Sequence, residues 1–442
     1  MAEARQNGFE TYGAAYTSLM PQGYCSRVID KRLQKLLKSF GGVEITGPKW
    51  CGKTWTGLAH AQSVDRLDDK ATLDIARTDP SLVLQGEPPH LIDEWQEVSA
   101  IWDAARRRID ERGSSKGLLL LTGSTSPKSK DIQHSGTGRI ARLRMWPMSL
   151  YELGLSTGAV SLHGLFNGDF EPSRNKTEIE DIARWCCRGG WPSTRDLEDG
   201  FALETPREYL NSILDVSIPK ENKSPEIARR LMAALAFNLS QAVTYKTLAK
   251  DMAYGDESAS PSMPTIEEYL EVLQRFYMIE YLPGWEPPIR GKQHLRTKPK
   301  RYFVDPSLDA ALLNVEPVAL LKDMQTLGNL FESLCLRDLR VYASVLDGVG
   351  NQIYYYRDSL GLEADAVIQL GDGRWAAFEV KLSDYKVEEG AKSLIRLGKK
   401  VTSNPAARTR EPEFLAVLVG KGDIAYRRED GVLVIPIATL GP

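Results

Sequence analysis

One eight-residue segment restricts the fold of this chain more than any other feature. Residues 47–54 read Gly-Pro-Lys-Trp-Cys-Gly-Lys-Thr, which fits the pattern G-x-x-x-x-G-K-[ST]. A short strand is expected at residues 43–46 before the segment, and a helical run through Ala59 follows it. A loop of this composition between a strand and a helix predicts a phosphate-binding loop (P-loop) of an α/β sheet rather than an ordinary turn.

The residue types of this loop suit a nucleoside triphosphate. Glycines let backbone N–H groups curl around phosphates at the start of a helix. Lys53 is expected to place a positive charge near the β and γ phosphates, and the Thr54 hydroxyl to bind Mg²⁺. The predicted nucleotide-binding residues are Gly47, Pro48, Lys49, Trp50, Cys51, Gly52, Lys53 and Thr54.

Polar side chains follow the next two apolar strands. The run Leu91-Ile92 ends in Asp93 and Glu94. Asp93 is expected to hold Mg²⁺ through water, and Glu94, on the other side of the strand end, to orient and deprotonate the attacking water. Ser124 follows the run at residues 118–121 and is a candidate sensor of the γ-phosphate. A surface Asp-Glu pair is the alternative, but beside a P-loop the two carboxylates favour hydrolysis over binding alone.

Residues 138–144 contain three arginines along an incipient strand. Arg142 and Arg144 share one face of that strand, and Arg139 lies on the other. We favour Arg139, which follows a glycine, as an arginine finger acting on the nucleotide of a neighbouring subunit. A solvated basic edge strand is the alternative.

Size and composition limit the remaining possibilities. A chain of 442 residues exceeds what one hydrophobic core usually serves, and 42% hydrophobic with 26% charged residues is typical of a soluble globular protein. The formal charge of −3 means that any nucleic-acid surface must be local. Neither the five cysteines nor the apolar runs predict a disulfide framework, a zinc site, a membrane span or an export signal, so we expect a cytoplasmic protein.

The patterns of helices and strands divide the chain into successive parts. The predicted fold class is α/β: a three-layer P-loop domain, then a winged-helix domain, then an α/β domain like restriction endonucleases. The expected boundaries are a flexible leader at 1–24, the ATPase core at 25–154, a lid or connector at 155–204, the winged helix at 205–315 and the nuclease-like domain at 316–442.

The predicted winged helix suggests DNA as a partner. Residues 244–253 and 265–276 have the pattern of two helices, and residues 278–282 that of a following strand. No acidic residue occurs between Ile289 and Arg301, and six basic residues predict salt-dependent contacts to DNA phosphates: Arg290, Lys292, Arg296, Lys298, Lys300 and Arg301. Three glutamates in the second helix would repel phosphates, which leaves a purely structural winged helix as the alternative.

The last third of the chain resembles the PD-(D/E)xK nuclease fold. Asp365 and Glu379 lie on strands joined by the turn at residues 371–373, where they could share one Mg²⁺. Lys381, facing the same way as Glu379, could position the hydrolytic water, and Glu332 on a preceding helix could complete the metal shell. The alternative, an inherited fold without cleavage, is the one we expect.

The order of these motifs resembles one family. The P-loop, Ile-Asp-Glu, Leu-Thr-Gly-Ser, Gly-Arg-Ile, Pro-Met-Ser-Leu-Tyr-Glu-Leu at residues 147–153 and Gly-Gly-Trp-Pro at 189–192 look like prokaryotic AAA+ ATPases whose C-terminal half is a domain of unknown function. The resemblance extends over about residues 24–420. It implies an AAA+ core, ATP as the ligand and a tendency to form rings, here expected to be hexamers. His90 departs from the family, which usually has an aliphatic residue there.

Together these features predict an ATP-hydrolysing AAA+ protein that binds and processes double-stranded or branched DNA as a ring oligomer. Two other functions remain open: an ATP-regulated switch or scaffold that binds a protein partner, and an ATP-gated defence or toxin nuclease.

Overall fold

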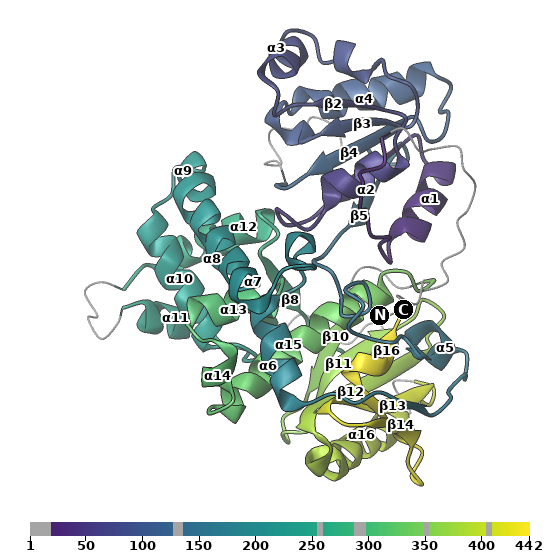
Figure 1. The fold of residues 1–442 in the computed structure, drawn as a ribbon, viewed down its shortest axis with the longest axis vertical. Coiled ribbons are helices and arrows are strands. Elements are labelled where there is room, and N and C mark those ends of the chain that lie inside the picture. Colours follow the sequence, from purple (N-terminus) through teal and green to yellow (C-terminus); the bar gives the residue numbers. More distant parts are fainter. Residues whose placement is uncertain (1–18, 127–135, 254–259, 287–297, 349–352, 404–408) are drawn as a thin grey trace.

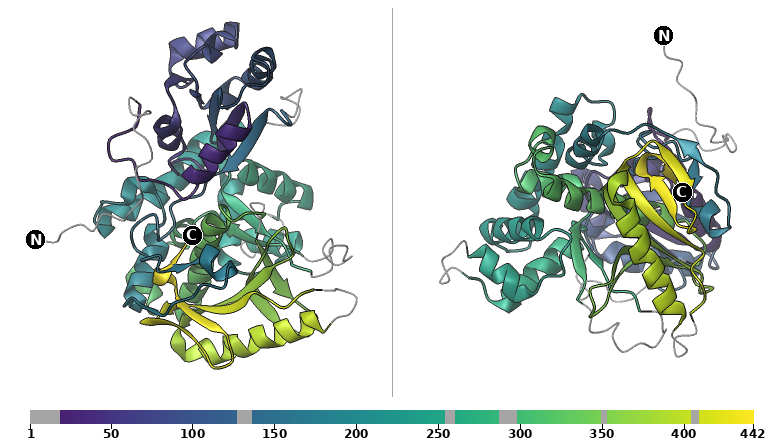
Figure 2. Two further views of the ribbon diagram at one scale, coloured as in Figure 1. Left: turned by 90° about the vertical axis from the view of Figure 1, so that its right-hand side faces the viewer. Right: turned by 90° about the horizontal axis from the view of Figure 1, so that it is seen from below.

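The computed structural model describes residues 19–126, 136–253, 260–286, 298–348, 353–403 and 409–442. These residues form an N-terminal α/β region at one end of the long axis, and a helical region and a C-terminal α/β region towards the other end (Figures 1 and 2). One hydrophobic cluster extends through the helical and C-terminal regions, whereas the N-terminal region has two clusters of its own. The first region is therefore packed as a separate core.

Five parallel strands form the N-terminal sheet, in the order β2-β3-β4-β1-β5. They are β1 (Gly42–Thr46), β2 (Ser63–Arg66), β3 (His90–Asp93), β4 (Leu119–Gly123) and β5 (Ile140–Arg144). Helices α1 (Asp30–Ser39) and α2 (Lys53–His60) cover one face, and α3 (Lys70–Thr78) and α4 (Ala100–Glu111) cover the other. Helices on both faces bury the central strands β1, β3 and β4 completely, which explains their largely apolar composition, whereas the edge strands β2 and β5 are partly exposed. The predicted three-layer P-loop sheet is confirmed.

Residues 155–204 contain short elements that pair with the C-terminal end of the chain. Strand β6 (Val160–Ser161) runs parallel to β16 (Leu440–Gly441), and β7 (Ser173–Arg174) is antiparallel to β14 (Ile424–Arg427). Two-residue strands leave no periodicity in the sequence, so this pairing was not predicted. The segment also contains three helices: α5 (Leu162–Phe166), α6 (Ile179–Arg188) and α7 (Asp199–Ala202).

The helical region has helix starts that the sequence marks clearly. Ser224, Thr244 and Ser262 each accept a hydrogen bond from the backbone N–H three residues later, as N-cap residues do. The helices are α8 (Glu204–Ser212), continued by a π-helical turn (Ile213–Ser217) into α9 (Ile218–Lys220), then α10 (Pro225–Phe237), α11 (Tyr245–Met252), α12 (Met263–Arg275), α13 (Pro306–Leu312) and α14 (Pro317–Leu320).

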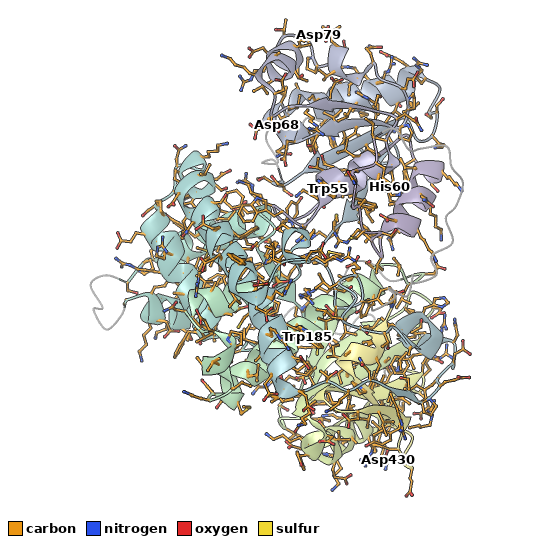
Figure 3. All side chains as sticks on the ribbon, in the orientation of Figure 1. Trp55, His60, Asp68, Asp79, Trp185 and Asp430 are labelled. Atoms are coloured by element: carbon orange, nitrogen blue, oxygen red, sulfur yellow. The ribbon has the colours of Figure 1, made fainter. Side chains whose placement is uncertain are left out.

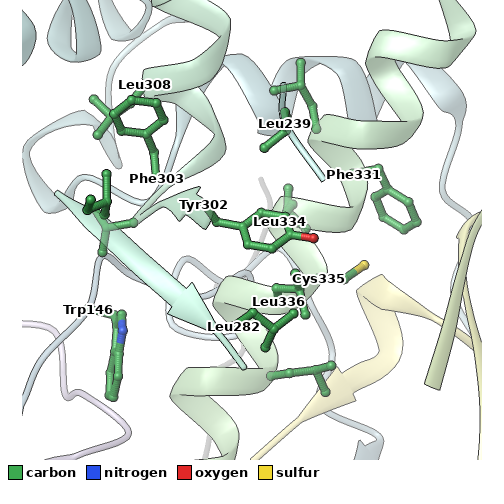
Figure 4. Packing of buried hydrophobic residues seen from close by; sticks show 14 of the residues in the cluster. Trp146, Leu239, Leu282, Tyr302, Phe303, Leu308, Phe331, Leu334, Cys335 and Leu336 are labelled. Carbon is green, nitrogen blue, oxygen red and sulfur yellow. The ribbon is translucent and has the colours of Figure 1, made fainter. Parts of the chain in front are cut away.

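An antiparallel hairpin follows α12. Its strands are β8 (Ile279–Leu282) and β9 (Lys300–Phe303). Strand β9 packs against α15 (Met324–Ala343), where Tyr302 lies beside Leu334 (Figure 4). The hairpin therefore joins the helical region to the C-terminal region.

The C-terminal sheet has seven strands in the order β10-β11-β12-β13-β15-β14-β7. The strands not yet located are β10 (Tyr354–Arg357), β11 (Glu363–Gln369), β12 (Trp375–Ser383), β13 (Phe414–Lys421) and β15 (Leu433–Pro436). Helix α15 packs on one face, and α16 (Val387–Thr402), between the parallel strands β12 and β13, packs on the other. An α/β arrangement was predicted for this part of the chain.

A buried ionic network holds two segments outside the nucleotide site, residues 147–153 and 189–192. The guanidinium of Arg337 on α15 lies 3.0 Å from an Asp305 carboxylate oxygen and 2.7 Å from one of Asp338. Asp338 also accepts a hydrogen bond from the N–H of Leu150, and Asp305 one from the N–H of Gly190. Because a buried charge needs a partner, this network fixes both motif segments against α15.

Candidate functional site

The P-loop lies between β1 and α2, at the carboxyl edge of the N-terminal sheet. Gly52 caps α2 with φ 101°, a left-handed conformation that favours glycine. At Gly47 a Cβ atom would lie 2.4 Å from the carbonyl oxygen of Met145, so a larger residue cannot fit. Both glycines of the motif are thus required by the backbone path. Trp55 and His60 mark the helix that the loop leads into (Figure 3).

Lys53 is 5% exposed, and its ammonium donates a hydrogen bond to the carbonyl oxygen of Pro48 at 2.7 Å. Its only partner among the described residues is thus a neutral carbonyl within the loop. A phosphate oxygen, being charged, forms a stronger hydrogen bond with an ammonium than a carbonyl does. The arrangement keeps Lys53 inside the loop and available to a nucleotide.

Arg27 stabilises the P-loop through a hydrogen bond to its backbone, a role that the sequence did not indicate. Its guanidinium donates to the carbonyl oxygens of Cys51 (2.7 Å) and Trp146 (2.9 Å) and pairs with Glu152 at 2.9 Å. Burial alone would lower the pKa of Arg27, but Glu152 outweighs it and raises that pKa. Glu152, from the Pro-Met-Ser-Leu-Tyr-Glu-Leu motif, thereby helps to fix the P-loop.

The two residues predicted to hold Mg²⁺ lie together. The hydroxyl of Thr54 donates to Asp93 at 2.9 Å, and the hydroxyl of Thr122 on β4 donates to the same oxygen. Burial raises the pKa of Asp93, and the hydrogen bonds from Thr122 and Thr54 oppose that shift. A hydroxyl and a carboxylate at one point supply the oxygen ligands that Mg²⁺ prefers.

Glu94 begins the turn that follows β3. Its backbone is left-handed (φ 57°), which redirects the chain after Asp93. Its carboxylate accepts a hydrogen bond from the Ser124 hydroxyl at 3.0 Å and another from the Gln96 amide. The predicted base and the predicted sensor are therefore in contact, and Gln96, which the sequence analysis did not include, also orients the carboxylate.

A cleft of about 320 Å³ opens beside these residues and is lined by both the N-terminal and the helical regions. Lys49 reaches across it to the hydroxyl of Ser217 at 3.0 Å. Burial and the nearby Lys220 lower the pKa of Lys49. On the helical side, Arg275 pairs with Glu221 at 3.0 Å and exchanges hydrogen bonds with the backbone of Ser126. The helical region thus packs directly beside the strand end that carries Ser124.

Arg139 lies at the opposite edge of the sheet. Residue 140 pairs with Gly42 at the amino end of the parallel strands β1 and β5, whereas the P-loop follows the carboxyl end of β1. A five-residue strand separates the two edges by about 16 Å. The Arg139 side chain is partly exposed and pairs with Asp110 at 2.9 Å. Arg139 therefore does not contact the P-loop of its own chain.

The predicted DNA-binding residues differ in accessibility. Arg290, Lys292 and Arg296 lie outside the described residues, and Lys298 is exposed. Lys300 was also predicted to contact DNA, but it is 3% exposed and its ammonium lies 2.9 Å from Glu363 and 3.2 Å from Glu332. A buried, ion-paired ammonium cannot reach a phosphate at the surface, so that expectation for Lys300 is wrong.

Arg301, the last of the six basic residues, is held within the helical region. Its guanidinium donates to the carbonyl oxygen of Val243 at 3.0 Å and lies over the rings of Tyr245 and Tyr281. The side chain is partly buried. Its cation–π contacts help to fasten β9 to β8 and α11.

The four residues of the predicted nuclease site converge where α15, β11 and β12 meet. Glu379 pairs with Lys381 at 2.6 Å, and Asp365 accepts the N–H of Val380 at 2.8 Å. Glu332 accepts the Tyr302 hydroxyl at 2.5 Å. Burial, followed by Glu332 and Glu379, raises the pKa of Asp365 well above its ordinary value. The sequence analysis grouped these four residues, but it did not include Glu363 and assigned Lys300 to DNA binding instead.

Two features are absent from the described residues. Within those ranges, no group of three or more His, Cys, Asp or Glu side chains has an arrangement that could hold a metal ion. No helix in the described part of the chain combines the length and apolar character needed to cross a bilayer.

Family models match three successive parts of the chain. Residues 41–154 match an AAA domain. Residues 179–319 match the domain of unknown function DUF8612, and residues 327–440 match the domain of unknown function DUF4143. No curated protein matches the chain.

Similar solved structures include a Walker-type ATPase of Pyrococcus abyssi, which is 12% identical, covers 65% of this chain and 94% of its own, and has a TM-score of 0.41. A RuvB variant of Thermotoga maritima is 15% identical over 60% of this chain and 93% of its own, with a TM-score of 0.28. The Aeropyrum pernix ORC1 protein in complex with DNA is 10% identical over 69% and 96%, with a TM-score of 0.27. At these TM-scores the three structures have no bearing on function.

The assignment therefore depends on the AAA domain match and on the geometry of the P-loop, Asp93 and Glu94. By both, the chain is an ATPase whose N-terminal region is similar to the AAA domains of P-loop ATPases.

Proposed function

We propose that this ATPase hydrolyses ATP at the P-loop, with Glu94 as the base, and uses the cycle to act on double-stranded or branched DNA as a ring-shaped homo-oligomer. The contact between Glu94 and Ser124, directly beside the Thr54–Asp93 pair, is the observation that carries the hydrolysis step of the proposal. Two carboxylates and two hydroxyls therefore lie together at one edge of the sheet, which supports their roles in this proposal.

Each residue has a defined task in this mechanism. The backbone N–H groups of residues 47–54 and the ammonium of Lys53 bind the phosphates and place the γ-phosphate near Ser124. Thr54 and Asp93 would hold Mg²⁺, which would supply positive charge to neutralise the phosphate oxygens. Glu94, oriented by Ser124 and Gln96, accepts the proton of the attacking water.

Support for DNA as the partner comes from the helical region. Three capped helices followed by a hairpin, α10 to β9, have the element order of a winged helix. The segment between β8 and β9 carries Arg290, Lys292, Arg296 and Lys298 without an acidic residue after Ile289. Such a segment would contact the phosphate backbone without reading sequence.

A salt titration of duplex DNA binding tests this step. Replacing Arg290, Lys292, Arg296 and Lys298 with Ala should lower the slope of log affinity against log salt by about 0.9 for each phosphate that is no longer neutralised. Arg301→Ala is the control, because Arg301 is engaged within the helical region. An unchanged slope in the fourfold variant would exclude this segment from the DNA interface and favour a protein partner.

Support for an oligomer comes from the position of Arg139 at the edge of the sheet opposite the P-loop. Arg139→Ala protein should bind ATP normally and hydrolyse it slowly, because only the transition-state charge loses its partner. Mixed assemblies of Arg139→Ala and Glu94→Gln subunits should recover part of the activity. Co-assembly without recovery would contradict a finger acting between subunits.

A further inference from the structure

The ammonium of Lys300 lies inside the carboxylate cluster of the C-terminal region. Lys300 belongs to β9 of the hairpin, whereas its partners Glu332 and Glu363 belong to α15 and β11. Tyr302, two residues along the same strand, reaches α15 as well (Figure 4) and donates its hydroxyl to Glu332. The hairpin therefore delivers a cation to acidic residues of a different region.

The charges in this cluster explain why a lysine is buried there. Four carboxylates, from Glu332, Glu363, Asp365 and Glu379, surround two ammonium groups, from Lys300 and Lys381. Lys381 pairs with Glu379, and Lys300 is the cation that pairs with Glu332 and Glu363. A lysine is almost never fully buried without such partners.

The distances from the Lys300 ammonium to the carboxylate oxygens are longer than those of a bound metal. The ammonium nitrogen lies 3.2 Å and 2.9 Å from its two carboxylate oxygens, whereas Mg²⁺ binds oxygen at about 2.1 Å. Each oxygen would have to move inward by about 1 Å to bind a metal in place of the ammonium. Glu363 and Lys381 are partly exposed, so an ion can enter from solvent once the ammonium is gone.

We propose that the Lys300 ammonium is a built-in cation that occupies the position of a divalent metal in this cluster and excludes such a metal while the hairpin is docked. The inference concerns the contact between the hairpin and the C-terminal carboxylate cluster, and it does not depend on the ATPase assignment. Metal-dependent phosphodiester cleavage needs a metal to bind the scissile phosphate and activate water. With Lys300 in place, the cluster holds the hairpin instead of performing that chemistry.

Mn²⁺ binding to the full-length protein tests the proposal by electron paramagnetic resonance, which counts bound ions. Lys300→Met keeps the length and packing of the side chain and removes its charge. This variant should bind one more Mn²⁺ ion than wild type, with at least 10-fold higher affinity than any binding of Mn²⁺ to this cluster in wild type. Lys298→Met is the matched control, since Lys298 is exposed and two residues away. The Thr54–Asp93 pair is unchanged in all these proteins, so any Mn²⁺ bound there is the same in each and does not affect the comparison.

Adding Glu332→Gln to Lys300→Met should abolish the gained site. A folded Lys300→Met protein that binds no more Mn²⁺ than Lys298→Met would overturn the proposal. If Lys300→Met does not fold, wild type and Glu332→Gln provide the test. Mn²⁺ should then shift their melting temperatures equally, and a larger shift for wild type would show that metal enters beside Lys300 and would also overturn the proposal.

Discussion

The nucleotide site and the C-terminal carboxylate cluster both contain a lysine that is nearly inaccessible to solvent, yet the two lysines have opposite partners. Lys53, 5% exposed, donates to the neutral carbonyl of Pro48. Lys300, 3% exposed, lies between the carboxylates of Glu332 and Glu363. A phosphate oxygen can replace a carbonyl as the hydrogen-bond partner of a lysine at little cost in free energy. Separating a buried ion pair, in contrast, costs several kcal/mol. The partner of the lysine therefore decides whether the site is available to a ligand.

The largest expected effect is the loss of ATP hydrolysis or ATP binding at the nucleotide site. Glu94→Gln should lower ATP turnover about 100-fold or more and leave ATP bound, because only the proton acceptor is lost. Lys53→Ala should lose binding as well, because the phosphates lose their ammonium. Phosphate release and fluorescent-nucleotide binding measure the two effects separately.

Glu97→Gln is the control for these two variants, since it makes the same charge change on an exposed side chain three residues away. It should retain near wild-type turnover. Wild-type turnover in Glu94→Gln would show that Glu94 is not the base.

The second effect breaks the ion pair of the C-terminal cluster. Lys300→Met leaves Glu332 and Glu363 without their cation, and should lower the free energy of unfolding by about 3–5 kcal/mol. Urea denaturation of this protein and of Lys298→Met, which should change stability by less than about 0.5 kcal/mol, measures the difference. Equal stability of the two variants would mean that the buried pair adds nothing to the fold.

Arg27 permits a smaller test of how the P-loop is supported. Arg27→Lys keeps the positive charge beside Glu152 but cannot span the carbonyl oxygens of Cys51 and Trp146. We expect ATP to bind about 10-fold more weakly, which corresponds to about 1.4 kcal/mol. Nucleotide titration by calorimetry measures the affinity, and unchanged binding would restrict Arg27 to a structural role.

The smallest effect concerns the reactivity of the cysteine thiols. Cys335 of α15 is fully buried and burial raises its pKa well above the ordinary value, while burial raises the pKa of Cys187 to about 12. Cys51 in the P-loop is also fully buried, and Cys25 is partly exposed. Because the reagent cannot reach a buried thiol, Ellman's reagent should label only Cys25 rapidly. Fast labelling that persists in Cys25→Ser would show that another cysteine is accessible and would contradict the prediction.

The sequence predicted the nucleotide site well because its parts are local. The P-loop, Asp93, Glu94 and Ser124 each follow an apolar strand of one parallel sheet, so their strand ends must meet at one edge. Arg27 and Glu152 were not predicted as supports, since they are 125 residues apart and their contact depends on the tertiary fold.

The sequence was less informative about the C-terminal side. Lys300 follows a run of basic residues and looks like a surface cation, because burial and distant partners leave no mark on its neighbours in the chain. Strands β6 and β7 escaped prediction for a related reason, since their partners lie more than 200 residues away. In each case a long-range contact outweighed the local pattern.

One reaction mixture tests the contrast between the two regions most directly. Wild-type protein is incubated with ATP, supercoiled plasmid DNA and Mg²⁺ or Mn²⁺, and phosphate release and DNA nicking are followed together, with Glu94→Gln and Glu379→Gln in parallel. We predict phosphate release that Glu94→Gln abolishes, and no nicking by any of the three proteins. Metal-dependent nicking that Glu379→Gln abolishes, or phosphate release that persists in Glu94→Gln, would contradict the account.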